Sequence, residues 1–366
     1  MSFSADDHKF MARALQLAKK GLYSTAPNPN VGCVLVKDGE IVGEGWHEKA
    51  GEAHAEINAL KQAGTKAEGA TAYVTLEPCC HQGKTPPCTD ALIKAKVKHV
   101  IAAMIDPHVK VAGKGLKQLE SAGIVVQHGL LEQQAKELNL GFIKRMQTRL
   151  PYVRCKLAMS LDGRTAMASG ESKWITAAAA REDVQRLRAK SSAILTGVGT
   201  VLADDPSMTV RLDDVNAQQP LRIVVDTNLS MPTDAKMLKE PGQTVLMTCS
   251  ADKHIAQVLK DAGAEIHMMP YCNTSVDLKS VLHQLSDMHI NDVLLETGAT
   301  LSGAMLQAGL IDELIIYMAP VLMGNTARGL FALPGLDAMQ DKIELDIVEQ
   351  RVVGQDIRIT AKVLSL

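Results

Sequence analysis

Apolar and polar positions in the first 150 residues alternate between helical and strand spacing. An apolar run with helical spacing follows Asp6 and Asp7 and ends at Gly21, which predicts a first helix. The next segment alternates around Asp38-Gly39, a dipeptide typical of a tight turn, and predicts a two-stranded hairpin. The remaining expected helices are 54–63, 89–95, 115–122 and 131–148, and the expected strands are 71–76, 99–104 and 124–128. This order predicts a three-layer sandwich with an at least partly parallel sheet.

The alternation restarts after Pro151, so we expect a domain boundary near residue 150. The expected strands of the second half are 152–160, 193–196, 221–226, 244–248, 293–296, 313–318, 343–353 and 356–363, with a turn at Gly354 between the last two. The expected helices are 177–189, 253–262, 278–285 and 300–308. No low-complexity linker separates the halves. We therefore predict two directly connected domains, 1–149 and 150–366, each large enough for its own core.

The composition disfavours several classes of partner. Hydrophobic residues make up 46% and charged residues 22%, which is typical of a globular protein. A formal net charge of -2 gives no overall attraction to nucleic acid or to an anionic membrane, and 3% aromatic residues offer few surfaces for stacking bases. The N-terminal segment has neither the charge nor the apolar run of a signal peptide. We expect a cytoplasmic protein with a small-molecule substrate and no nucleic-acid or membrane partner.

Three of the seven cysteines lie together at positions 79, 80 and 88, which favours a metal site over disulfides. His54, Cys79 and Cys88 supply one imidazole and two thiolates. Such a set binds zinc and leaves a fourth position for water, as in catalytic sites. Glu56 lies two residues after His54, and a carboxylate beside the metal can carry a proton from water to a leaving amine. Glu56 is therefore the expected catalytic acid–base residue.

The spacing of these residues restricts where they lie. Side chains two residues apart in the middle of a helix point to opposite faces. His54 and Glu56 therefore reach one metal only from the start of a helix, and a helix start also favours a thiolate. The alternative is a structural zinc site in which Cys80 or His81 is the fourth ligand.

The segment His54-Ala55-Glu56, with Pro78-Cys79 and a further cysteine, resembles the signature of the cytidine-deaminase superfamily. The longer segment EPCCHQGKTPPC, together with PNPNVGCVLV, resembles the pyrimidine deaminase of riboflavin biosynthesis. This resemblance implies a cytidine-deaminase-like three-layer αβα sandwich, bound zinc and a phosphorylated pyrimidine substrate. The substrate contacts that it implies are Asn28, His47, His81 and Lys84. One departure is Cys80, where many relatives carry serine.

Three segments of the second half resemble the reductase domain that accompanies this deaminase in bacteria: KLAMSLDGRTAMASGESKWIT, ILTGVGTVLADDPSMTVR and ETGATLSGAML. The resemblance implies a dihydrofolate-reductase-like α/β domain that uses NADPH to reduce a ribosylamino group to a ribitylamino group. The NADPH contacts that it implies are Ala158, Trp174, Thr200, Asp204, Gly298, Ala299, Thr300, Leu301, Ser302, Gly303 and Ala304. The implied substrate contacts are Ser172, Arg188, Met208, Arg211 and Glu296, with Lys156 nearby.

The residue types fit those implied roles. Free backbone N–H groups at the helix start after 293–296 suit a phosphate, whereas the lone G-x-G at 197–199 is a weak signal. Arg188 and Arg211 can clamp a 5′-phosphate, and Lys156 and Glu296 are the candidates for proton donor or orienting group. Trp174 is alternatively a core residue.

The leading hypothesis is a bifunctional enzyme that deaminates a diaminopyrimidine ribosylamino 5′-phosphate and then reduces the ribosyl group. Because enzymes of this kind are often symmetric assemblies, we also expect a homo-oligomer. One alternative is an RNA-editing deaminase with an RNA-recruiting C-terminal domain, which the charge and the few aromatic residues disfavour. Another is a non-catalytic zinc module joined to a nucleotide-binding sensor or a dimerisation domain.

Overall fold

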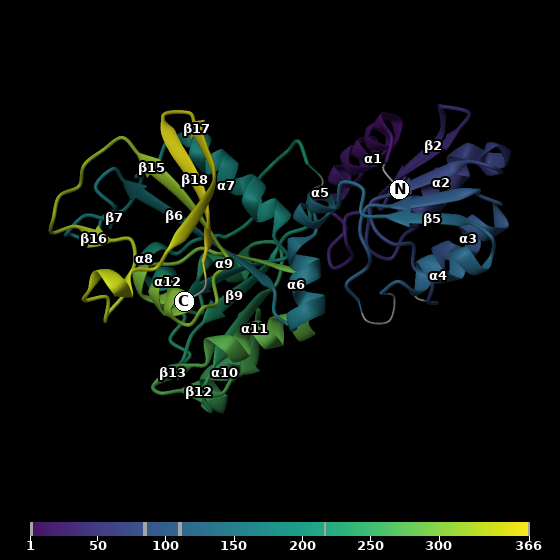
Figure 1. Ribbon diagram of the computed structural model, residues 1–366. Helices are drawn as coiled ribbons and strands as arrows, with labels where there is room; N and C mark the ends of the chain where they lie inside the picture. The colour runs from purple at the N-terminus through teal and green to yellow at the C-terminus, as the bar shows by residue number, and fades with distance from the viewer. Residues whose placement is uncertain (1–2, 83–85, 109–111, 216, 365–366) are drawn as a thin grey trace. The chain divides into compact units, whose positions relative to one another are not determined.

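The computed structural model describes residues 3–82, 86–108, 112–215 and 217–364. The chain folds as two compact units, Met1–Arg149 (unit 1) and Leu150–Leu366 (unit 2). Each unit contains its own main sheet (Figure 1). Within the described ranges, the helices lack the combination of length and apolar character that crossing a bilayer requires.

Unit 1 is a three-layer αβα sandwich. Its helices are α1 (Ala5–Ala18), α2 (Ala55–Ala63), α3 (Cys88–Lys94), α4 (Lys114–Ser121), α5 (Glu132–Glu137) and α6 (Leu140–Thr148), with short 3-10 helices at Lys19–Gly21 and Gly64–Ala67. Its strands are β1 (Gly32–Lys37), β2 (Glu40–Trp46), β3 (Thr71–Val74), β4 (His99–Ala102) and β5 (Val125–His128). The sheet order is β2-β1-β3-β4-β5; β1 runs antiparallel to its two neighbours, and β3, β4 and β5 are parallel.

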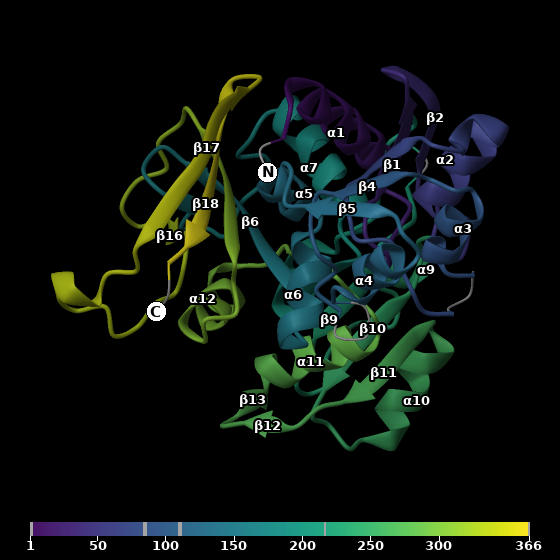
Figure 2. The same cartoon turned by 45° about the vertical axis from the view of Figure 1, so that its right-hand side comes forward.

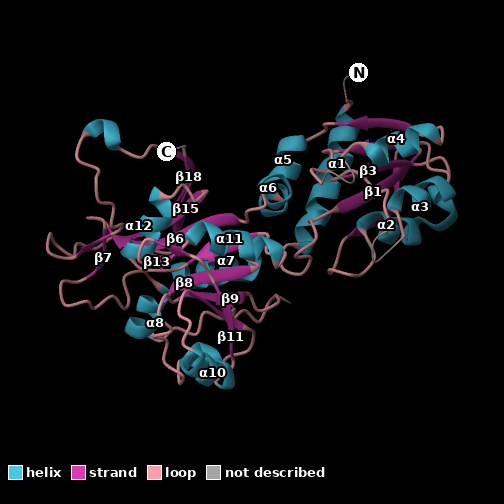
Figure 3. Ribbon diagram, turned by 90° about the horizontal axis from the view of Figure 1, so that it is seen from below, coloured by secondary structure: helices cyan, strands magenta, loops and turns pink. Residues whose placement is uncertain are grey.

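Alternation along β1 explains the layers, because successive side chains of a strand point to opposite faces. Cys33 and Leu35 pack with buried residues of α2, α3 and α4. Val34 and Val36 pack on the other face with α1 and α5. Figure 3 shows β1 and β3 between α1 and α2. The contact with α1 is so close that a Cβ at Gly32 would lie 2.0 Å from the carbonyl oxygen of Ala14.

The single helix expected over 131–148 is wrong, because this segment forms the two helices α5 and α6. They are separated at Asn139, which is 4% exposed. Its side chain accepts a hydrogen bond from the backbone N–H of Asn30 at 2.7 Å and donates one to the carbonyl of Asn30 at 3.0 Å. These contacts with a loop distant in sequence hold Asn139 at a break that the apolar period does not reveal.

Unit 2 is built on a nine-stranded sheet of order β11-β10-β9-β8-β14-β6-β15-β18-β17. The strands are β6 (Tyr152–Ser160), β7 (Arg164–Ala166), β8 (Ala193–Gly197), β9 (Leu221–Val225), β10 (Thr244–Thr248), β11 (Ala264–Met268), β12 (Tyr271–Cys272), β13 (Ser275–Val276), β14 (Asp292–Leu295), β15 (Glu313–Ala319), β16 (Arg328–Gly329), β17 (Leu345–Val353) and β18 (Asp356–Val363). The helices are α7 (Ala178–Lys190), α8 (Val198–Asp204), α9 (Lys236–Lys239), α10 (Lys253–Asp261), α11 (Leu278–Asp287) and α12 (Ala299–Gln307), with a short 3-10 helix at Met339–Asp341.

Helices cover both faces of this sheet. Leu294 of β14 packs with buried residues of α8, α9 and α10. Val293 and Leu295 pack on the other face with α11 and α12. The seven strands from β11 to β15 are parallel, so the carboxyl ends of β8, β14 and β6 lie at one edge of the sheet, where open α/β sheets bind ligands. The last two strands form the antiparallel hairpin drawn in yellow in Figure 2.

Candidate active sites

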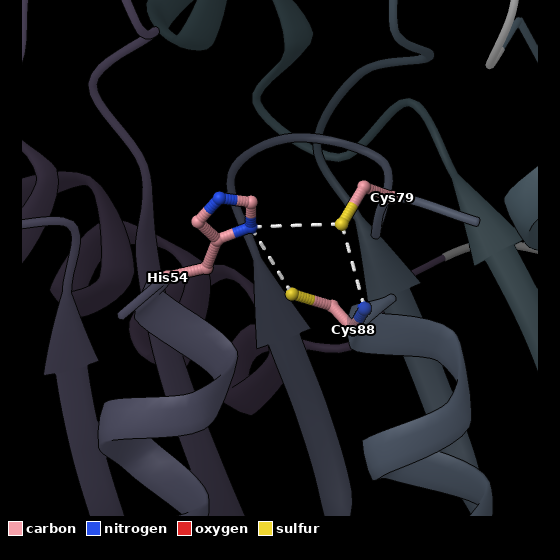
Figure 4. A group of neighbouring side chains, drawn as sticks. All are labelled: His54, Cys79 and Cys88. Carbon is pink, nitrogen blue, oxygen red and sulfur yellow. Dashed lines mark hydrogen bonds between the residues drawn. The ribbon is translucent and has the colours of Figure 1, made fainter. Parts of the chain in front are cut away.

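His54, Cys79 and Cys88 converge in unit 1. Their ligand atoms all lie within 4.8 Å of one another (Figure 4). Among the residues that the structure describes, these three form the group that could hold a metal ion. The His54 Nδ1 atom is 3.5 Å from the Cys79 sulfur and 3.3 Å from the Cys88 sulfur. His54 is the N-cap of α2, and Cys88 is the first residue of α3. The two helix starts and the turn after β3, which carries Cys79, therefore place the three donors around one point.

The pKa values of the two thiols in this group shift in opposite directions. A hydrogen bond with Cys88 and another with His54 lower the pKa of Cys79 to about 4. The hydrogen bond with Cys79 and burial raise the pKa of Cys88 above its usual range. One thiolate is therefore already favoured. Two sulfur donors and one imidazole nitrogen within a few ångströms suit a tetrahedral zinc ion with one position left open.

Glu56 lies in the first turn of α2 and is 4% exposed. Burial and the nearby Cys79 raise the pKa of Glu56 to about 7, and its carboxylate interacts with the Cys88 thiol. The carboxylate is thus directed at the ligand group without being one of its three members.

Asn28 and His47 form a pair beside His54. The ring of His47 lies 5.3 Å from the ring of His54, at an angle of 82°. Its Nδ1 is 3.1 Å from the carbonyl of Ala53, and its Nε2 is 3.0 Å from the Asn28 amide nitrogen. These contacts fit a neutral ring that donates through Nδ1 and accepts through Nε2. Burial also lowers the pKa of His47, which favours the same state.

The loop between the two cysteines is only partly described. Its His81 is exposed, and its ring lies nearly parallel to that of His108 at 6.4 Å. Lys84 lies outside the described residues. Cys80 is half-buried and is not a member of the ligand group, nor is His81. The described geometry therefore offers neither as a fourth ligand, which disfavours a closed structural site.

Glu296 and Arg188 form a buried ion pair at the carboxyl end of β14. Arg188 donates through Nε and Nη2 to the two carboxylate oxygens at 2.6 and 3.0 Å, and the side chains are 12% and 10% exposed. Its Nη1 donates to the carbonyl of Thr209 at 3.1 Å. Of the five N–H groups of a guanidinium, two remain for a ligand. The phosphate clamp by Arg188 and Arg211 stays a prediction that must use those two.

Lys156 lies on β6, the strand paired with β14, one residue beyond the pairing of Cys155 with Leu295. It is thereby a neighbour of Glu296 on the adjacent strand. Burial lowers the pKa of Lys156, although the charge of Glu296 opposes this change. Burial alone would raise the pKa of Glu296, but Arg188 holds that pKa below its usual value. Ala158 follows on the same face of β6, since alternate residues of a strand share a face.

Two further substrate candidates lie on the segment after α8. Met208 is 3% exposed and has a positive φ of 49°. Arg211 donates through Nη1 to the Thr209 hydroxyl at 3.0 Å, and its backbone N–H donates to the Gln185 side chain at 3.0 Å. Thr209 therefore contacts both Arg188 and Arg211 and joins them into one group.

The starts of α8 and α12 meet at Thr297. The Thr297 hydroxyl oxygen lies 3.4 Å from the backbone nitrogen of Gly197 and 3.4 Å from the hydroxyl oxygen of Thr200. Gly197 and Gly298 are the N-caps of the two helices. Helix starts have backbone N–H groups without partners inside the helix, and two of them together suit a pyrophosphate.

The predicted NADPH residues 298–304 divide into two groups. Gly298, Ala299, Thr300 and Leu301 form the cap and first turn of α12. Ser302 is fully buried with its hydroxyl near Cys155, and a Cβ at Gly303 would lie 2.0 Å from the carbonyl oxygen of Ala332. Ser302 and Gly303 therefore pack the helix, and Leu301 packs against the core. Gly298, Ala299 and Thr300 remain to face a ligand, and Ala304 is exposed on the helix.

Trp174 and Ser172 lie on the segment that precedes α7. Trp174 is 72% exposed, so it is not a core residue, and the guanidinium carbon of Arg181 lies 4.7 Å from a ring centroid. Ser172 is half-buried. Lys173 donates to the carbonyl oxygen of Asp204 at 3.1 Å and lies 3.3 Å from its carboxylate. This ion pair ties the segment that carries Trp174 to the end of α8.

Thr209, Thr297 and Lys173 are not among the site residues that the sequence predicts. Thr209 contacts Arg188 and Arg211. Thr297 contacts Thr200 and Gly197, and Lys173, the neighbour of Trp174, contacts Asp204. Thr297 follows Glu296 directly and ends the buried strand, which is a local signal. Thr209 and Lys173 act through contacts with residues distant in sequence, and no local pattern marks them.

Two family models match the chain. The cytidine and deoxycytidylate deaminase zinc-binding region matches residues 4–104, and the RibD C-terminal domain matches residues 151–359. The first match contains His54, Glu56, Cys79 and Cys88, and the second contains the Arg188–Glu296 pair. The matches thus cover both groups of side chains.

Whole-chain relatives agree with these matches. The riboflavin biosynthesis protein RibD of Escherichia coli is 51% identical, with 96% of this chain and 98% of the relative covered. The protein of the same name from Haemophilus influenzae is 50% identical, with 98% of each chain covered. Among solved structures, Acinetobacter baumannii RibD, form 1, has a TM-score of 0.92 at 49% identity, covering 98% of this chain and 99% of that chain. The Thermotoga maritima diaminohydroxyphosphoribosylaminopyrimidine deaminase/5-amino-6-(5-phosphoribosylamino)uracil reductase has a TM-score of 0.87 at 32% identity, with the same coverage. The chain belongs to the RibD family of riboflavin biosynthesis proteins.

Proposed function

We propose that unit 1 carries the deaminase activity and unit 2 the reductase activity, each at the group of side chains described above. The chain is a bifunctional deaminase and reductase of riboflavin biosynthesis that uses zinc and NADPH. One observation carries the assignment of residues in unit 1: His54, Cys79 and Cys88 converge with Glu56 beside them, inside the segment that matches a deaminase zinc-binding region.

In unit 1, His54, Cys79 and Cys88 would hold zinc, and Glu56 would move the proton. When bound, zinc supplies Lewis acidity that makes water acidic enough to serve as a nucleophile at neutral pH. Glu56 takes up a proton from water and delivers it to the exocyclic amine, which leaves as ammonia while a carbonyl forms. Its burial keeps the carboxyl group away from bulk water during this transfer.

Asn28 and His47 would orient the pyrimidine in unit 1. Their mutual hydrogen bond and the bond of His47 to Ala53 fix both side chains. The second amide hydrogen and the carbonyl oxygen of Asn28 then remain for a heterocycle, since an amide offers two donors and one acceptor. His81 and Lys84 would meet the 5′-phosphate.

In unit 2, the starts of α8 and α12 would bind the pyrophosphate of NADPH, and Trp174 would cover another part of the cofactor. When bound, NADPH supplies a hydride to C1′ of the opened, imine-like sugar. Arg188 keeps Glu296 in its carboxylate form, so Glu296 orients the substrate and does not donate a proton. Lys156 is the remaining candidate and would donate its proton to the imine nitrogen. The phosphate would contact Arg211 and the two free donors of Arg188.

The substrates follow from the Thermotoga maritima relative, which is named for a diaminopyrimidine deaminase and an aminouracil reductase. We propose the same two substrates here, taken in that order. The alternative of an RNA-editing enzyme is not favoured, because the family match covers both units.

A coupled assay on the zinc-loaded full chain tests the proposal. Mass spectrometry of the diaminopyrimidine product should first show exchange of an amine for a carbonyl, with ammonia release, and then the gain of two hydrogens. NADPH oxidation should begin only after the first step. Glu56→Gln should lower ammonia release by about 10²–10⁴-fold and leave NADPH oxidation intact on deaminated substrate. Glu52→Gln, at an exposed carboxylate in the same segment, is the control. Unchanged ammonia release in Glu56→Gln would show that the assigned proton carrier is wrong.

We also propose a homo-oligomer in the cytoplasm. All seven cysteines are free, which fits a reducing compartment. The edge strand β17 exposes Leu345, Ile347, Val348 and Val352 by 41% to 73%, and an exposed apolar edge is a template for pairing with a second copy. Sedimentation analysis tests this: Ile347→Lys should shift the assembly toward the monomer, and an unchanged mass would exclude this edge.

A further inference from the structure

Glu77 is a buried carboxylate between β3 and the zinc ligand Cys79, and it is 3% exposed. Four backbone N–H groups donate to it. Those of Asp106 and Gly113 donate to Oε2 at 3.1 and 2.8 Å, and those of Gly115 and Leu116 donate to Oε1 at 2.8 and 3.4 Å. These donors come from the loop after β4 and from the start of α4. The Glu77 side chain therefore binds two segments, each about 30 or more residues further along the chain, to the turn that carries Cys79.

The contact between this turn and α4 has little freedom. A Cβ at Gly115 would lie 2.1 Å from the carbonyl oxygen of Pro78, the residue before Cys79. The start of α4 thus lies directly on the backbone of the turn. Its unpaired N–H groups and partial positive charge compensate the buried charge of Glu77.

Thr89 of α3 makes a second contact with this turn, at the backbone of Cys79 itself. The carbonyl of Cys79 accepts a hydrogen bond from the backbone N–H of Thr89 at 3.2 Å. The Thr89 hydroxyl lies 3.3 Å from this carbonyl and 3.1 Å from the side-chain oxygen of Gln118 on α4. The Cys79 turn is therefore held before the ligand by Glu77, which binds the start of α4, and after it by Thr89 of α3, which also contacts Gln118 of α4.

The segment that Glu77 holds also borders the predicted substrate site. The backbone of Asp106 donates to Glu77, and the Asp106 carboxylate accepts a hydrogen bond from the backbone of His108 at 2.7 Å. The ring of His108 lies along the ring of His81. Displacement of this segment would therefore reach His81 as well as Cys79.

We propose that Glu77 is a positioning residue of the zinc site, which sets the place of the Cys79 sulfur by docking α4 and the segment after β4 against the Cys79 turn. This inference rests on the zinc site proposed above. Glu77→Gln keeps the size of the side chain but replaces one acceptor oxygen by an amide that faces two N–H donors. Those two hydrogen bonds are lost, and the turn and α4 move apart.

Metal affinity of the full chain tests this role separately from activity. Zinc binding is measured by competition with a chromophoric chelator, and the geometry is read from the absorption of the Co²⁺-substituted protein. Glu77→Gln should weaken zinc binding by about 10–100-fold, as for other residues that orient metal ligands, and should alter the Co²⁺–thiolate bands. Glu120→Gln, at an exposed carboxylate on α4, should leave both unchanged.

A purely structural role would give a different result. Glu77→Gln would then lower the unfolding temperature of the metal-free chain. Zinc affinity would stay within about twofold of wild type, and the Co²⁺ bands would not change. This outcome overturns the proposal. Should Glu77→Gln fail to fold, Gly115→Ala decides, because its methyl group pushes α4 away from Pro78 while Glu77 is retained. Weakened zinc binding in folded Gly115→Ala supports the proposal, and wild-type affinity overturns it. A wild-type chain that binds no zinc would instead refute the zinc site itself.

Discussion

The Arg188–Glu296 pair gives the most direct test of the electrostatics of unit 2. Arg188→Met removes the guanidinium but keeps much of the apolar volume. Glu296 then loses two hydrogen bonds of 2.6 and 3.0 Å at a site where its side chain is 10% exposed. The variant therefore leaves a buried carboxylate without its main partner.

The expected cost is large because the pair is buried. Removing one partner of a buried ion pair destabilises a protein by about 3–5 kcal/mol. Lys156 remains near Glu296 and compensates part of the charge, so we expect about 3 kcal/mol, the lower end of that range. Arg186→Met is the matched control on the same helix. Its ion pairs with Glu182 and Asp214 are 40% or more exposed, and exposed pairs contribute about 0–1 kcal/mol.

The pH dependence gives the test a sign. In the wild type, Arg188 holds the pKa of Glu296 below its usual value, so the pair stabilises the fold above the unfolded pKa and is lost as the pH falls through the folded pKa. Without Arg188, burial dominates and the pKa of Glu296 should rise above its unfolded value. The variant then binds the proton more tightly when folded and loses stability as the pH rises. The difference between variant and wild type should therefore be larger at about pH 8 than at about pH 5.

Urea unfolding of the full chain measures this difference. A Trp46→Phe background leaves Trp174, in the unit that contains Arg188, as the fluorescent reporter. A loss of stability in Arg188→Met no larger than that in Arg186→Met would contradict a stabilising role of the buried pair. An equal loss at both pH values would exclude the buried carboxylate as its source.

Three further predictions address the two sites and the packing of α12. Removing zinc with a chelator should abolish ammonia release and leave NADPH oxidation on deaminated substrate unchanged, and loss of both activities would contradict two separate sites. Trp174→Ala should raise the KM for NADPH by about 5–150-fold, because aromatic stacking is worth about 1–3 kcal/mol per base. The urea midpoint should not change, because the ring is 72% exposed; an unchanged KM would remove Trp174 from the cofactor site. Gly303→Ala should destabilise unit 2 by about 1–3 kcal/mol because its Cβ would meet the Ala332 carbonyl, whereas Gly298→Ala, with open space around it, should leave the urea midpoint unchanged.

Local patterns predicted the long elements of the fold and its class. The parallel strands of unit 2 are buried on both faces, so they appear in the sequence as continuous apolar runs with turns between them. The helices α8 and α9 were not predicted, because helices of seven and four residues show little periodicity, and the strand β11 was not predicted either. The break at Asn139 was missed for another reason: its bonds run to Asn30, more than one hundred residues away.

The candidate sites also divide into residues that local patterns predict and contacts that depend on residues distant in sequence. The residues His54, Glu56, Cys79 and Cys88 form a pattern of types and spacings that chemistry restricts strongly, and the structure places their side chains together. The internal partner of Arg188 did not follow from the sequence. Arg188 and Glu296 are 108 residues apart, and only the fold shows that most of the guanidinium is used within the chain.

The three buried glutamates show why residue type alone does not assign a role. Glu77 receives four backbone N–H groups, which suits a fixed acceptor that docks neighbouring segments. Glu296 faces the permanent charge of Arg188, which suits a fixed carboxylate that orients a substrate. Glu56 instead contacts the thiol of Cys88 and its own backbone, which leaves acceptor capacity beside the metal ligands. The partners of each carboxylate therefore support three different proposed roles for the same residue type: a positioning residue at Glu77, an orienting residue at Glu296 and a proton carrier at Glu56.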